Sequence, residues 1–142
     1  MTEETRLEPR WIERLDVFNH AVSKLKQVLE LRKEHELNEF ERDSLVKRFE
    51  FTYEMAWKLL MSYEKSNGVT DIHGSKDVVR YASALSLIEN GEAWMDMIDT
   101  RNLTSHIYDE EKVIDLVEEI ILSHYPLLEE LNKKMNELAK QR

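Results

Sequence analysis

The chain has 142 residues, of which 42% are hydrophobic and 35% charged, and its net charge is −9. This length suits one domain over residues 1–142, and the acidic charge disfavours a general nucleic-acid binder, because phosphate contacts need lysine and arginine. Three glycines and two prolines are too few for a turn-rich β fold, and the absence of cysteine excludes disulfides, thiolate metal sites and a thiol nucleophile.

The first half of the chain predicts two long helices. Apolar residues recur at steps of three and four over residues 11–31, which indicates an amphipathic helix with Pro9 near its first turn. After a polar link, Asn38 is suited to cap a second helix over residues 39–67, and Gly68 is suited to end it.

The second predicted helix contains the aromatic-rich stretch RFEFTYEMAWKLL, whose spacing is that of a buried helix face. The residues expected in the core are Phe49, Tyr53, Trp57 and Leu60, with Phe51, Met55 and Leu59 broadening the stripe. Glu50, Glu54 and Lys58 fall on another face, where Glu54 and Lys58 are spaced for a helical ion pair. We expect the Glu50 and Glu54 face to be solvated.

The second half predicts a broken pair of shorter helices and a last long helix. Ser75 is suited to cap a helix over residues 76–88, and Asn90 and Gly91 separate it from a segment over residues 92–103. The inward residues of this pair are expected to be Val78, Val79, Ala82, Leu85, Ile88, Trp94, Met97, Ile98 and Leu103.

Asp109 can cap the last helix, and Pro126 should kink or restart it. We therefore expect an all-α fold, an up-and-down antiparallel four-helix bundle with a short, broken helical segment.

The segment RNLTSHIYDEE, residues 101–111, gathers the polar groups that carry chemistry. Residues five apart on a regular helix are about 140° apart, so Arg101 and His106 share a site only if the helix ends or loosens over residues 103–105. The turn would then present Arg101, Asn102, His106 and Tyr108 at one end of the bundle. Spacing alone favours a structural explanation, in which Arg101 binds a helix carboxyl end and His106 is a hydrogen-bonded turn residue.

The same groups suit metal-free RNA cleavage. A histidine can accept a proton from, or donate one to, the reacting oxygens, and an arginine can stabilise the charge that develops on phosphorus. Because one histidine supplies only a base or an acid, this reaction requires a two-fold dimer that pairs two copies of the motif.

Other functional classes lack their sequence signatures. The five histidines share no ligand spacing, and the phosphate-loop, dinucleotide and serine-hydrolase motifs do not occur, so we expect neither a metal nor a cofactor. The N-terminus has no apolar signal core, and no apolar run approaches membrane-spanning length. These features predict a cytoplasmic protein.

With these residues in place, the chain resembles a known family. RNLTSHIYDEE is similar to the Arg-x4-His signature of the HEPN superfamily in its Arg-Asn-x3-His-x-Tyr form. RFEFTYEMAWKLL and NGEAWMDMIDTRNLTSHIYDE resemble the nucleotidyltransferase substrate-binding protein family, a branch related to the HepT toxins. The similarity covers residues 11–131, with two separate motifs in the right order.

The resemblance implies a homodimeric bundle and a partner, a minimal nucleotidyltransferase that acts as the antitoxin. It implies that Arg101 and His106 are the catalytic pair of a metal-independent RNase, that Asn102 orients or binds, and that Tyr108 accepts AMP from the partner. RNA would be the substrate, and neither DNA nor a membrane is an expected partner. The alternatives are a non-catalytic substrate-binding subunit of the nucleotidyltransferase and a purely structural helical interaction module.

Overall fold

The computed structural model describes residues 9–106 and 109–142, and every regular element in these two ranges is helical. Helix α1 (Arg10–Glu34) and helix α2 (Glu39–Ser66) form an antiparallel hairpin, followed by α3 (Ser75–Ala84) and α4 (Gly91–Leu103). A 3-10 turn, η2 (Thr104–His106), leads towards α5 (Glu110–Glu119), which continues through a π-helical turn, η3 (Ile120–His124), into α6 (Tyr125–Lys140).

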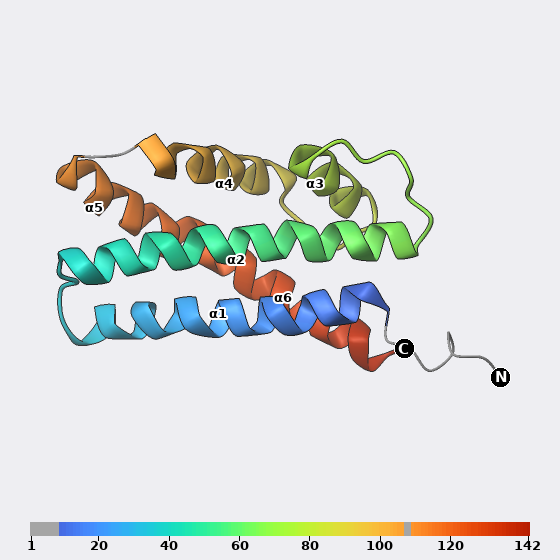
Figure 1. Cartoon of the computed structure of the whole chain (residues 1–142), viewed down its shortest axis with the longest axis horizontal. Helices are drawn as coiled ribbons and strands as arrows, with labels where there is room; N and C mark the ends of the chain where they lie inside the picture. The colour runs from blue at the N-terminus through green and yellow to red at the C-terminus, as the bar shows by residue number, and fades with distance from the viewer. Residues whose placement is uncertain (1–8, 107–108) are drawn as a thin grey trace.

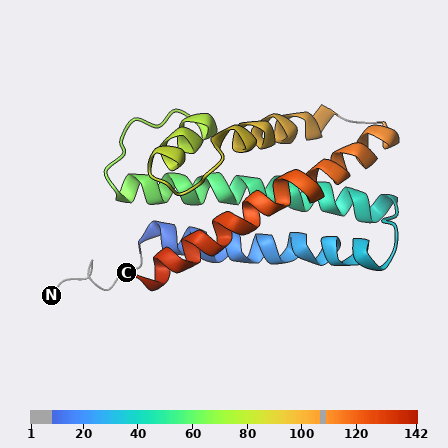
Figure 2. The same cartoon turned by 180° about the vertical axis from the view of Figure 1, so that it is seen from behind.

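The helices make four arms that run alternately up and down: α1, α2, the α3–α4 pair and the α5–α6 arm (Figure 1). Helix α2 lies in the middle, with α1 along one side and α3 and α4 along the other. The α5–α6 arm crosses α2 and α1 diagonally on one face, as the reverse view shows (Figure 2). The predicted all-α bundle is confirmed, and the face opposite α6 is left uncovered by any helix of the described residues.

Capping residues set most helix boundaries where the sequence predicted them. Asn38 forms a full capping box with Glu41, each side chain accepting the other's backbone N–H at 2.9 Å. Asp109 caps α5 by accepting the Glu111 N–H at 3.0 Å. The predicted cap at Ser75 was wrong: Gly74, with φ 106°, occupies that position, and Ser75 is already the first helical residue.

Three apolar residues predicted to face inward are exposed instead: Phe51 is 50%, Leu85 42% and Leu103 56% exposed. Helix α3 ends at Ala84, so Leu85 leaves the helical register, while Ile88 is buried from the following loop. Leu103 is the last residue of α4, where no neighbouring helix covers it. Phe51 lies on the uncovered face of α2. The remaining predicted core residues of α2 to α4 are buried, apart from Met55 and Trp57, which are partly buried.

The last predicted helix is interrupted just before Pro126. In η3 the N–H of Tyr125 bonds to the Ile120 carbonyl oxygen, one residue further back than in an α-helix. Pro126 has no N–H and crowds the carbonyl four residues earlier, so a widened turn immediately before it relieves the clash. The predicted restart at Pro126 is confirmed, and its form, a π-helical turn, was not predicted.

Candidate functional site

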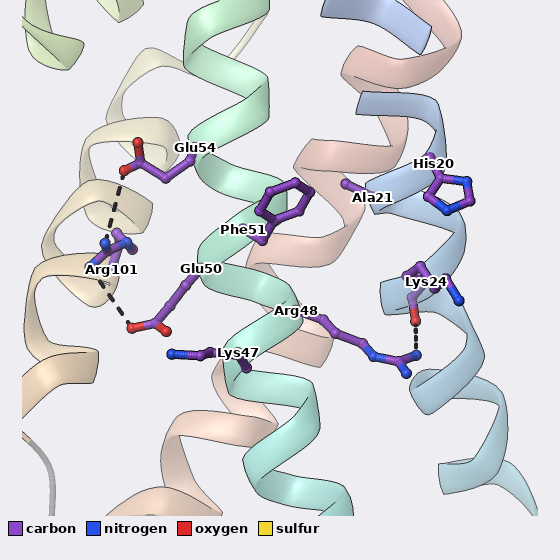
Figure 3. A pocket seen from close by; sticks show the side chains of 9 residues that line it. All are labelled: His20, Ala21, Lys24, Lys47, Arg48, Glu50, Phe51, Glu54 and Arg101. Carbon is purple, nitrogen blue, oxygen red and sulfur yellow. Dashed lines mark hydrogen bonds and ion pairs between the residues drawn. The ribbon is translucent and has the colours of Figure 1, made fainter. Parts of the chain in front are cut away.

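Arg101 lies in the last turn of α4, and its side chain points towards α2 (Figure 3). Its Nη1 is 3.9 Å from Glu50 Oε2, and its Nη2 is 3.9 Å from Glu54 Oε1. The Arg101 side chain is 28% exposed, and its buried Nε has no hydrogen-bond partner among the described residues. Arg101 is thus held by two carboxylates at the outer limit of ion pairing and keeps unused donor capacity.

The two carboxylates are one turn apart on α2, so both face α4. The Thr104 hydroxyl, in η2, is within hydrogen-bonding reach of the Glu50 carboxylate and of the Arg101 carbonyl oxygen at 2.8 Å; its single proton goes to one acceptor at a time. The expectation of a solvated Glu50 and Glu54 face was wrong, because both side chains are only partly exposed. Glu54 contacts Arg101 and accepts the Trp57 indole N–H at 3.2 Å, in place of the predicted pair with Lys58.

The helix break that the Arg-x4-His spacing requires is present. Helix α4 ends at Leu103, and the 3-10 turn carries the chain to His106, so Arg101 and His106 lie at the same end of the α3–α4 arm. Asn102 and His106 are both exposed. The His106 side chain contacts no polar partner among the described residues. Tyr108, predicted to accept AMP, lies outside the described residues.

His124 anchors the residue that precedes Arg101. Its Nε2 lies 2.8 Å from the Thr100 hydroxyl and 3.5 Å from Glu119, and its ring stacks on Phe49 at 5.7 Å between centroids. Burial lowers the pKa of His124, and the nearby Glu119 carboxylate opposes that shift in part. A neutral His124 therefore ties α4 to the end of the π-helical turn and holds a structural position.

A cavity of about 580 Å³ opens on the uncovered face, between α1 and α2, and reaches Arg101. Most of its lining residues are cationic or aromatic: His20, Lys24, Lys47, Arg48, Arg101 and Phe51, with Ala21, Glu50 and Glu54 completing it. Arg48 spans the two helices, donating to the Lys24 carbonyl oxygen at 2.6 Å and to Gln27 Oε1 at 3.2 Å (Figure 3). This cavity adds basic groups beside Arg101 that the motif does not contain.

The sequence analysis missed these basic residues, although the chain holds a signal for them. In an antiparallel hairpin, residues equally distant from the link lie opposite each other, and the link here is residues 35–38. Lys24 and Arg48 are nearly symmetric about it, as are Ala21 and Thr52, whose hydroxyl lies 3.2 Å from the Ala21 carbonyl oxygen. Pairing the two predicted helices in this way would have brought Lys24, Lys47 and Arg48 together.

No group of three or more potential metal ligands occurs in residues 9–106 and 109–142. Within the same ranges, no helix is both long and apolar enough to cross a membrane.

Comparison with known proteins identifies the family of this chain. The family model described as "Nucleotidyltransferase substrate binding protein like" matches residues 13–137, nearly the whole bundle. The chain therefore belongs to the nucleotidyltransferase substrate-binding protein family, and the resemblance seen in its motifs is confirmed. Among individual proteins, it is 31% identical over 96 residues to a Haemophilus influenzae protein named "Probable ribonuclease HepT". That alignment covers 63% of this chain and 66%, just under two thirds, of the relative's length.

Solved structures agree on the fold. A Haemophilus influenzae protein with the fold of a substrate-binding domain of a nucleotidyltransferase superposes with a TM-score of 0.70 at 28% identity, over 82% of this chain and 98% of that one. A Thermus thermophilus protein gives 0.71 at 27% identity, over 80% and 94%. The tri-AMPylated Shewanella oneidensis HEPN toxin, solved in complex with an MNT antitoxin, gives 0.73 over 92% and 99%, but at 15% identity it supports the fold alone.

Proposed function

We propose that this protein is the HepT-like toxin of a toxin–antitoxin pair, a metal-independent endoribonuclease whose partner is a minimal nucleotidyltransferase. The observation that carries the proposal is the end of α4 at Leu103, two residues after Arg101, where the 3-10 turn Thr104–His106 breaks the helix. This break brings Arg101 and the exposed His106 to one end of the arm, in a chain of the family that includes a relative named as a ribonuclease.

In the proposed reaction His106 accepts the proton of a ribose 2′-hydroxyl, and the 2′-oxygen attacks the adjacent phosphorus. The bond from phosphorus to the 5′-oxygen breaks, and the leaving oxygen takes a proton from His106 of a second copy. Arg101, with donors not satisfied by Glu50 and Glu54, stabilises the added charge on the phosphoryl oxygens. The mechanism therefore needs a homodimer in which two such helix ends face one RNA strand, and Asn102 is placed to orient it.

Neutralisation by AMP transfer is the second part of the proposal. The phenol oxygen of Tyr108 attacks the α-phosphorus of ATP bound to the nucleotidyltransferase, its proton passes to solvent or to a base of the nucleotidyltransferase, a phosphodiester bond forms, and pyrophosphate leaves. The added adenylate brings bulk and negative charge two residues from His106, where it would exclude RNA and pair with Arg101. The Shewanella oneidensis toxin, AMPylated in complex with its antitoxin, supports this reaction as a capability of the fold.

Growth after induction tests the nuclease. We expect wild-type protein to arrest growth, and Arg101→Ala and His106→Ala to abolish the arrest at equal expression. Lys133→Ala, on the exposed side of α6, is the matched control and should remain toxic. Purified wild-type protein should also cut RNA in the presence of a chelator. A toxic His106→Ala variant, or a strictly monomeric active protein, would contradict the mechanism.

Mass spectrometry tests the modification. Incubation with the cognate nucleotidyltransferase and ATP should add one or more adenylates to Tyr108, and Tyr108→Phe should remove the increment and the protection of growth together. If Tyr108 stays unmodified while growth is still protected, AMP transfer is wrong, and the partner neutralises the toxin by binding alone.

A second candidate is a non-catalytic subunit that binds a substrate for the nucleotidyltransferase. The ion pairs of Arg101 with Glu50 and Glu54 favour it, because they partly neutralise the cation that the nuclease needs. A wild-type protein that never arrests growth but raises the nucleotidyltransferase's turnover would establish this function in place of the first.

A further inference from the structure

The cavity between α1 and α2 is a basic site on an acidic protein. The chain carries a net charge of −9, yet Lys24, Lys47, Arg48 and Arg101 line one hollow together with His20. Among the described residues, the carboxylates in the lining are Glu50 and Glu54, and both pair with Arg101. None of the described carboxylates forms an ion pair with Lys24, Lys47 or Arg48, although Glu50 lies in the same wall as Lys47. A cleft lined by charges of one sign raises the local concentration of oppositely charged ligands, so this hollow favours an anion.

Each of these three cations has a defined position. Lys24 and Lys47 are exposed, on opposite sides of the hollow, and their ammonium groups pair with no carboxylate of the described residues. Arg48 is held across the helices by the Lys24 carbonyl and Gln27, both uncharged, so it keeps its full positive charge. A held guanidinium between two exposed ammonium groups suits a phosphate, because arginine fixes orientation and lysines add charge.

Phe51 adds a flat apolar surface to the same hollow. Its ring projects from α2 between Arg101 and α1, and it is 50% exposed (Figure 3). An exposed aromatic ring is common by itself, but here it stands within a cationic cavity of about 580 Å³, a volume typical of small-ligand sites. A planar base stacks on such a ring while its phosphate reaches the cations. A purely apolar ligand would satisfy the ring and leave the cations unpaired.

We infer that this cavity binds a nucleotide unit, with the phosphate on Lys24, Lys47 and Arg48 and the base on Phe51. The inference rests on the proposed function, because it takes the bound nucleotide to be one unit of a single-stranded RNA whose chain continues towards Arg101. A free nucleotide such as AMP has the same chemistry, and the experiment separates the two. The homodimer of the proposed mechanism leaves this cavity open in our inference, since a two-fold contact across it would bring like charges together.

Binding is measured by fluorescence anisotropy with a short labelled single-stranded RNA, and by calorimetry with AMP, on full-length His106→Ala protein so that no strand is cut. The test variants are the double variant Lys24→Glu with Lys47→Glu, and Phe51→Ala. The matched controls make the same changes outside the hollow: Lys26→Glu with Lys133→Glu, on exposed positions of α1 and α6, and Phe40→Ala, 81% exposed on α2. Circular dichroism checks that all variants are folded.

We expect the double Lys24 and Lys47 variant to weaken binding by about tenfold or more, and to lower the salt dependence by about one to two in log–log slope. Phe51→Ala should weaken binding by about tenfold through lost stacking. Both controls should stay within about twofold of the parent, because they lie outside the proposed contacts. If RNA binds with this pattern, the source is an RNA strand; if only AMP does, the source is a free nucleotide.

Four results would overturn the inference. The first two are that neither RNA nor AMP binds, and that test and control variants weaken binding equally. The other two are that inorganic phosphate or polyglutamate displaces the ligand as effectively as AMP does, and that Phe51→Ala changes only the oligomeric state of the protein and not its ligand binding. Its failure is distinct from that of the nuclease. A protein that binds RNA here but never cuts it loses only the nuclease, whereas one that cuts RNA unaffected by the Lys24 and Lys47 changes loses only this site.

Discussion

Two histidines lie at irregular points of the helices, and their surroundings are opposite. His106 ends a 3-10 turn, is exposed, and has no polar partner among the described residues. His124 ends a π-helical turn, is 1% exposed, and is bonded to Thr100. A helix irregularity therefore does not mark function by itself. What separates the two is access: of these two histidines only His106 is open to solvent, while His124 holds Thr100, the neighbour of Arg101, in place.

The largest expected effect is on the exposed histidine. His106→Ala should lower RNA cleavage by about 10²- to 10⁴-fold, the usual contribution of a general acid or base, with the melting temperature unchanged. Cleavage of a labelled RNA and thermal unfolding measure the two quantities on the same preparation. If His106→Ala lost as much stability as a core variant, His106 would be a structural residue like His124, and the proposed difference between the two histidines would be wrong.

The second largest effect concerns Glu64. It shows what burying an ionisable group without a partner costs in stability, and it serves as a reference for the buried His124. Glu64, in α2, is fully buried with no partner for either carboxylate oxygen among the described residues, and burial raises its pKa to about 8. The folded state thus holds a proton that the unfolded chain releases near pH 4.5, so stability falls as pH rises from there to about 8. Glu64→Gln should stabilise the protein by roughly 3 kcal/mol at pH 7 and flatten this pH dependence.

Denaturant titrations of Glu64→Gln and the parent at several pH values measure this effect. Glu89→Gln, an exposed position in the loop before α4, is the control and should change little. If the parent and Glu64→Gln have the same pH dependence of stability, Glu64 is hydrated or paired.

The third effect concerns the buried histidine. His124→Ala removes a stacked ring and a hydrogen bond from the core and should cost about 2 kcal/mol or more. The lowered pKa of His124 means that the unfolded chain takes up a proton below about pH 6.5 before the folded state does, so the contribution of His124 to stability falls as pH falls there, opposite in sign to the contribution of Glu64. Unfolding at pH 7 and pH 5.5 should show that His124→Ala lacks this loss.

The smallest effect concerns the hydrogen bonds of Thr100. Thr100→Val keeps the shape of the side chain and removes the hydroxyl that lies 2.8 Å from His124 Nε2 and donates to Glu119 Oε1 at 3.3 Å, so it should cost about 1 kcal/mol. If His124 positions Arg101 through this contact, cleavage should also fall with KM unchanged, while Thr70→Val, in the exposed loop after α2, should alter neither. A Thr100→Val variant with unchanged stability and full activity would show that His124 contributes only by packing in the core and does not position Arg101.

The fold was largely readable from local rules because its boundaries are set locally. Asn38 and Asp109 act through side-chain bonds to N–H groups within three residues, and sequence alone specifies these. Phe51 and Leu103 fit the helical period and yet are exposed, because the number of neighbours around a helix depends on the whole bundle. The π-helical turn depends on how Pro126 is accommodated, which spacing does not specify.

In the candidate site, too, features set within one segment were predictable from the sequence, and features set by the packing of several helices were not. The break after Arg101 followed from its spacing to His106, because a regular helix cannot bring residues five apart to one face. The carboxylates of Glu50 and Glu54 come from a helix about 50 residues earlier, and their contact with Arg101 depends on how α2 packs against α4. The basic groups of the cavity likewise need the hairpin register. Chemistry within one segment was predictable, and chemistry assembled between segments was not.

The paired carboxylates around Arg101 have a consequence for selectivity. Because Glu50 and Glu54 already sit near the guanidinium, an incoming anion must compete with two fixed negative charges. Under the proposed function, a phosphate that also reaches Lys47 would meet a second cation and share the guanidinium, which a singly charged anion at Arg101 alone would not do. The two acidic residues would then favour ligands of higher negative charge, while their ion pairs hold the Arg101 side chain in place.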